Sequence, residues 1–87
     1  MNLSEMRDDL VAMQGIYLGI LEDNKANGSS LVVDQCKFGI TQCDNLIRSL
    51  DELMAAEVID LSKWRRFRNS CGHLAQHVLD LIKWLSS

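Results

Sequence analysis

Hydrophobic residues recur along the chain at alternating steps of three and four positions, in three separate stretches. The first stretch contains Leu3, Met6, Leu10, Met13, Tyr17 and Ile20. This spacing places the side chains on one face of an α-helix, because each residue of a helix advances by about 100°. Asn2 or Ser4 can cap the start of the helix by accepting a backbone hydrogen bond. The pattern therefore predicts an amphipathic helix over residues 3–23.

Two glycines, Gly15 and Gly19, lie four residues apart on one side of this hydrophobic series. Small residues at this spacing can allow a second helix to approach closely. The alternative is that each glycine simply destabilises the helix by roughly 1 kcal/mol relative to alanine. We favour the packing interpretation.

The second hydrophobic stretch follows a polar loop over residues 24–30 that contains an Asn-Gly pair and ends in two serines. Its series is Val33, Cys36, Ile40, Cys43, Ile47, Leu50 and Met54. Leu46 and Leu53 widen the apolar face, as expected for a helix that contacts two neighbours. The serines can cap the helix start. We predict a second helix over residues 30–57.

The third stretch begins after a break near residues 57–61, where Asp60 is a suitable N-cap. Ile59 before it could pack on Trp64 and fix the direction of entry into the helix. The series is Trp64, Phe67, Cys71, Leu74, Val78, Leu81 and Leu85. It predicts a third helix over residues 61–86.

Three long helices with two short connections predict an all-α fold, a small three-helix antiparallel bundle. A chain of 87 residues and 9.9 kDa suits one helical domain over residues 1–87. Phe38, Ile82 and Trp84 are apolar but lie outside the three series. If exposed together, they would form a contact surface, which makes a homodimer or a partner footprint that includes Trp84 an expected arrangement.

The charge is uneven along the chain. Nine Lys and Arg residues against twelve Asp and Glu residues give a net charge of −3, which argues against a nucleic-acid binder acting by bulk charge. Residues 1–60 carry four basic and eleven acidic side chains, a balance of −7. Residues 61–87 carry five basic and one acidic side chain, a balance of +4. Such asymmetry marks a partner surface or two segments that attract each other.

Features that would direct the chain to a membrane or to secretion are missing from the sequence. The start of the chain lacks the basic and apolar regions of a secretory signal, and no apolar run reaches the roughly 20 residues of a membrane span. Three cysteines without a CxxC pair fit a reducing compartment. We therefore expect a cytoplasmic protein.

The cysteines and histidines offer little catalytic chemistry. Cys36 and Cys43 lie about 10 Å apart along one helix, too far for a disulfide, and all three cysteines are expected to be small buried hydrophobic residues. His73 and His77 have the i, i+4 spacing of metal ligands, with Asp80 three residues further on. A fourth ligand is not evident. We interpret these three side chains as a solvated polar face and predict neither a metal nor a cofactor.

Positive charge is concentrated at the start of the third predicted helix, in Arg65, Arg66 and Arg68. Arginine is mildly unfavourable there, because the N-terminal end of a helix already carries partial positive charge. Trp64 and Phe67 belong to the hydrophobic series and are expected in the core. The three arginines suit carboxylates, either on a partner protein or on the acidic first two helices.

The string Arg68-Asn69-Ser70-Cys71-Gly72-His73 resembles the R-x4-6-H motif of the HEPN family, small helical proteins that include metal-independent ribonucleases. The resemblance covers roughly residues 64–86. It implies that His73 would act as general acid and base, that Arg68 would hold the scissile phosphate and that Asn69 would orient them. It also implies a dimer in which two motifs form one cleft.

These observations favour a small non-enzymatic protein-binding module, an inhibitor or adaptor that binds a protein or a protein complex. Small acidic proteins of this kind include those carried by phages and other mobile elements. The expected partner-binding residues are Arg65, Arg66, Arg68 and Trp84. The alternative is a HEPN-like ribonuclease that uses Arg68, Asn69 and His73, so nucleic acid is the less favoured partner.

Overall fold

The computed structural model describes residues 2–26 and 28–86 and consists of three α-helices. These are α1 (Leu3–Asn24), α2 (Ser30–Ala55) and α3 (Leu61–Ser86). No strand occurs in the described part of the chain. Each helix begins at the residue expected from the hydrophobic pattern. Two end slightly differently, since α1 is one residue longer than predicted and α2 is two residues shorter.

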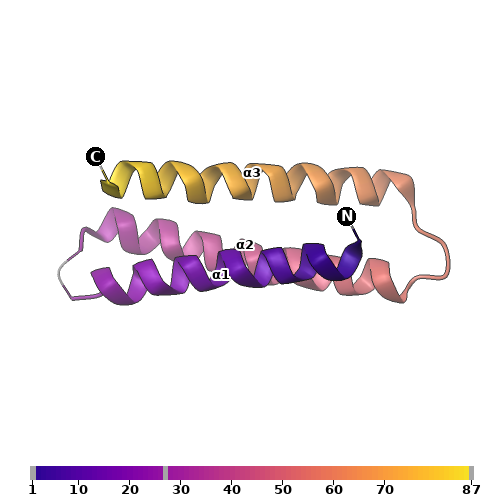
Figure 1. The fold of residues 1–87 in the computed structure, drawn as a ribbon, viewed down its shortest axis with the longest axis horizontal. Helices are drawn as coiled ribbons and strands as arrows, with labels where there is room; N and C mark the ends of the chain where they lie inside the picture. Colours follow the sequence, from indigo (N-terminus) through magenta and orange to yellow (C-terminus); the bar gives the residue numbers. More distant parts are fainter. Residues whose placement is uncertain (1, 27, 87) are drawn as a thin grey trace.

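The helices form an elongated bundle with dimensions of 48 × 19 × 18 Å. Figure 1 shows that α1 and α3 run in the same direction and that α2 runs in the opposite direction. The closest pair is α1 with α2, while α3 packs along this pair. The predicted all-α antiparallel three-helix bundle is confirmed.

Side chains at the helix starts supply the backbone partners that a first turn lacks. Asn2 Oδ1 accepts a hydrogen bond from the Glu5 amide at 2.8 Å, and Glu5 accepts one in return from the Asn2 amide at 3.4 Å. Ser29 accepts one from the Val32 amide. Asp60 Oδ1 accepts from the Ser62 amide at 2.8 Å. These caps explain why the helices begin where they do.

The core lies along the three predicted hydrophobic series, except that Val32 is buried at the start of α2, where the series predicted Val33. Its buried apolar side chains are Leu10, Tyr17, Val32, Cys36, Cys43, Leu46, Leu50, Leu53, Phe67, Leu74, Val78 and Leu81. Two members of the series, Met54 and Leu85, are exposed, and each lies near the C-terminal end of its helix. Burial of the rest provides the main driving force for folding.

Polar contacts align α1 with α2 on the outside of this core. Arg7 Nε lies 3.1 Å from Asp51 Oδ1, and Gln14 Nε2 donates a hydrogen bond of 2.6 Å to Asp44 Oδ1. Both contacts join residues on opposite antiparallel helices. Since the Arg7–Asp51 pair is about half exposed, it contributes to register more than to stability.

The expected packing role of Gly15 and Gly19 is wrong within the chain. Both residues are exposed, and an added Cβ atom would meet nothing within 4 Å. The glycine that allows close helix packing is Gly39 of α2, which is buried against the ring of Tyr17 from α1. None of the helices in the described part of the chain is both long and apolar enough to cross a membrane.

Candidate functional site

The arginine surface, defined as Arg65, Arg66 and Arg68, lies at the start of α3 and is exposed. The ion pairs among the described residues are Arg7 with Asp51 and Lys25 with Glu22. The three arginines therefore have no carboxylate partner in the described structure, although the chain has more acidic than basic residues. The acidic helices α1 and α2 do not neutralise this surface.

The three arginines point in different directions around α3. Arg66 faces α2, because it lines a depression together with the α2 residues Leu46 and Leu53. Arg65 precedes Arg66 by about 100° and Arg68 follows it by about 200° of helical rotation. Arg65 and Arg68 therefore lie three residues apart on the outer side of α3, away from the depression. The arginine surface divides into this pair and Arg66.

The depression beside Arg66 has a volume of about 350 Å³ and lies between the end of α2 and the start of α3. Leu46, Leu53 and Phe67 supply apolar atoms to it. Val58, in the connection between the helices, also lines it and is 84% exposed. The site thus combines an apolar lining with charged side chains of both signs, Lys63 and Arg66 with Glu52 and Asp60.

Trp84 lies near the opposite end of α3 and is 53% exposed. It lines a second, shallower depression between α2 and α3 together with Leu31 and His77. Phe38 is about half exposed and contacts His77 edge to face, at 5.4 Å between ring centroids. Ile82 is also exposed, but it lies about 200° around the helix from Trp84. The structure therefore does not combine Phe38, Ile82 and Trp84 into one surface.

His77 does not belong to a solvated polar face, contrary to the sequence prediction. Its Nδ1 lies 2.5 Å from the hydroxyl of Tyr17 in α1, and its Nε2 lies 2.6 Å from Oε1 of Gln35 in α2. The consistent proton arrangement has the Tyr17 hydroxyl donating to Nδ1 and Nε2–H donating to Gln35. His77 thus joins all three helices.

His73 and Asp80 are exposed, as expected for a polar face. Of the three residues predicted to share that face, only His77 is part of the bundle interior. No three metal-binding side chains converge within residues 2–26 and 28–86. The signal that could have indicated the polar network was Tyr17 in the hydrophobic series. A buried tyrosine hydroxyl requires a hydrogen-bond partner, and that partner must come from another helix.

The cysteines are unreactive by environment. Burial raises the pKa of the Cys43 and Cys71 thiols to about 11 each and also raises that of Cys36. Burial, with smaller effects of Cys43 and Cys36, raises the pKa of Tyr17 to about 12. All three cysteines are free, and the raised pKa values favour the protonated thiol over the reactive thiolate. Their prediction as small hydrophobic residues fits these positions, with Cys71 less deeply buried than the other two.

The residues of the HEPN-like motif lie on an uninterrupted stretch of α3. Arg68, Asn69 and His73 are exposed, and no hydrogen bond joins them within the described structure. Asn69 and His73 are four residues apart and share a face. Arg68 and His73 are five residues apart and point about 140° away from each other. A single chain therefore places Asn69 beside His73 but not Arg68.

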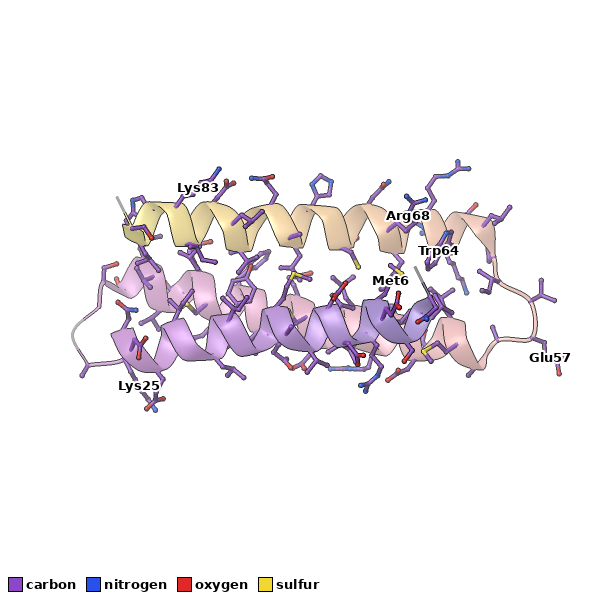
Figure 2. The ribbon with its side chains drawn as sticks, viewed as in Figure 1. Met6, Lys25, Glu57, Trp64, Arg68 and Lys83 are labelled. Atoms are coloured by element: carbon purple, nitrogen blue, oxygen red, sulfur yellow. The ribbon has the colours of Figure 1, made fainter. Side chains whose placement is uncertain are left out.

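Comparisons of the chain with protein-family models, with curated proteins and with solved structures found no match. Figure 2 shows Arg68 and Lys83 near opposite ends of α3, while Trp64 extends from the same helix toward the side on which Met6 of α1 lies. Trp64 and Met6 both pack against the core. The outer side of α3 is thus available for contacts with other molecules, and its inner side holds the bundle together.

Proposed function

We propose that this protein is a non-enzymatic binding module, an adaptor or inhibitor, and that its arginine surface binds carboxylates of a partner protein. One observation carries the proposal. Three neighbouring arginines are exposed without an ion pair in a chain whose acidic residues outnumber its basic ones. Glu52 and Asp60 line the same depression as Arg66, but neither forms an ion pair with it among the described residues.

The chemistry of the surface supports a protein partner. Guanidinium groups bind carboxylates with two parallel hydrogen bonds, and they are frequent among residues that dominate binding energy. Beside the arginines, Leu61 is a strongly exposed apolar residue at the start of α3. A partner segment that carries both carboxylates and apolar side chains would match this combination.

Other features support the same class of protein. The thiols have raised pKa values and the metal-binding residues do not converge within the described chain, so neither feature supports catalysis. Three free cysteines are compatible with a reducing compartment such as the cytoplasm. The small size and acidic composition suit an inhibitor carried by a phage or another mobile element.

The test compares two variants with the same change in net charge. In the first variant, Arg65 and Arg68 are changed to Glu. In the control, Lys25 at the end of α1 and Lys37 in α2 are changed to Glu. Partner proteins are captured from the native host with each protein and then titrated individually. We expect the arginine variant to bind more weakly by over about 2 kcal/mol, with a marked dependence on salt and little change in melting temperature.

Three results would contradict the proposal. Equal binding by the arginine variant would exclude this surface. RNA cleavage by the wild type that is lost in His73→Ala would favour the ribonuclease alternative. A loss of helical signal in the arginine variant, measured by circular dichroism, would show that the arginines stabilise the fold and would also overturn the proposed role.

A further inference from the structure

We propose that two copies of this chain associate through the α2–α3 face, with Trp84 of each copy seated in the depression beside Arg66 of the other. The α2–α3 face is the side of the molecule on which both helices line the two depressions, and Arg66 and Trp84 belong to its opposite ends. Arg66 belongs to both proposals, but Arg65 and Arg68 lie outside this face, so reversing those two residues tests the proposed function without changing the dimer interface.

The positions of Arg66 and Trp84 along α3 allow this pairing. They are 18 residues apart, which is five full helical turns, so both point to the same side of the helix at a separation of about 27 Å. A two-fold axis perpendicular to the helices, near the middle of α3, exchanges the two ends of the face. Each indole ring then meets the depression of the other copy, as a symmetric dimer requires.

The two parts have complementary shape and chemistry. Trp84 is a large, half-exposed aromatic side chain, and the depression has a volume of about 350 Å³ with Leu46, Leu53 and Phe67 in its lining. Arg66 at the rim can place its guanidinium over the indole ring of the second copy, a favourable cation–π contact. The same insertion would cover Val58, which is otherwise 84% exposed.

One pair of opposite charges, Asp80 and Arg66, comes close in this antiparallel arrangement. The two-fold axis places Asp80 of one copy opposite Ser70 of the other. In that second copy, Ser70 and Arg66 are about one helical turn apart, or about 6 Å along the helix axis. The depression beside Arg66 also contains Lys63, Glu52 and Asp60, and Asp60 already caps α3. Between the two depressions, Phe38 of α2 contacts His77 of α3.

The size of the bundle limits the interface. A side of the bundle 48 Å long and 19 Å wide has an area of about 900 Å². Typical specific interfaces bury about 800 Å² per partner, so the dimer must use most of this side.

The first experiment measures the molecular mass in solution by sedimentation equilibrium and light scattering. Protein concentrations up to about 1 mM are used, so that a dimer with a dissociation constant in this weak range is still detected. We expect the wild type to form a dimer of two 9.9 kDa chains. Trp84→Ala should weaken the dimer by about 30-fold or more. The matched control is Leu79→Ala, which removes a 51% exposed side chain from another side of α3 and should leave the dimer intact.

The second experiment exchanges charges. Arg66→Asp and Asp80→Lys should each weaken the dimer by about tenfold, and the double variant should recover most of this loss. The Arg65 and Arg68 double reversal should leave the mass unchanged, which separates this test from that of the proposed function. A monomeric wild type, equal effects of Trp84→Ala and Leu79→Ala, or absence of rescue by the charge exchange would overturn the dimer.

Discussion

The ring of Tyr17 in α1 occupies the space that a side chain at Gly39 in α2 would fill. A Cβ atom at Gly39 would overlap the ring, which is fully buried. The missing side chain lets the tyrosine lie against the backbone of α2, and its hydroxyl then reaches His77 of α3. This single contact connects the close α1–α2 packing with the position of the third helix.

Gly39→Ala should therefore destabilise the bundle by about 1–3 kcal/mol, because the Tyr17 ring must shift within a packed core. Gly15→Ala is the control. It adds the same methyl group to open space in a helix and should raise the free energy of unfolding by about 0.5–1 kcal/mol. Urea unfolding followed by circular dichroism measures both. Effects of the same sign would contradict the packing described for Gly39.

The network of Tyr17, His77 and Gln35 should show coupled energetics. Tyr17→Phe removes the donor to His77 Nδ1, and His77→Ala leaves the buried hydroxyl of Tyr17 without its acceptor. Each change should cost about 1–3 kcal/mol. In the double variant the losses should fall short of additivity by about 0.5 kcal/mol or more.

The exposed residue His73 supplies the control for this network. His73→Ala should change the free energy of unfolding by less than about 0.5 kcal/mol. Strict additivity of the two network variants would show that the observed hydrogen bond contributes no coupling. A large effect of His73→Ala would indicate instead that the solvated side of α3 stabilises the bundle.

Two positions on one side of α2 should differ in their contribution to stability. Leu50 is fully buried, so Leu50→Ala should cost about 2–5 kcal/mol. Met54 lies one turn further and is 46% exposed, and Met54→Ala should cost less than about 1 kcal/mol in the monomer. Thermal and urea unfolding provide the comparison. Similar losses of stability in the two variants would show that the Met54 side chain packs in the core as closely as that of Leu50.

Stability should fall at alkaline pH. Cys43 and Cys71 have ordinary pKa values of 9.0 that the fold raises to about 11, and Tyr17 rises from 10.0 to about 12. The unfolded chain therefore releases these protons first as the pH rises. The free energy of unfolding should be constant with respect to these groups below pH 9 and should decrease between pH 9 and 12.

Replacing Cys43 and Cys71 with Ala removes two of the titrating groups. The double variant, although less stable at neutral pH, should lose less additional stability between pH 9 and 11 than the wild type does. Urea unfolding at intervals of pH measures the slope. An unchanged slope would mean that the two thiols do not cause the alkaline loss.

The sequence by itself determined the helices, their caps and the side of each helix that faces the core. These features depend on interactions between residues close in the chain. Asn2 and Glu5 cap each other across three positions, and hydrophobic residues at steps of three and four define one face of a helix. The outer positions of Arg65 and Arg68 follow from the same helical rotation.

Only the tertiary structure decided which residues meet across helices. The hydrogen bond of His77 with Tyr17 spans 60 positions, and that with Gln35 spans 42, so no local pattern indicated them. The sequence suggested Gly15 and Gly19 as the close contact, but the relative rotation and height of α1 and α2 placed Gly39 there. Those two parameters depend on how whole side chains interlock in the core, which the spacing of hydrophobic residues along one helix does not specify.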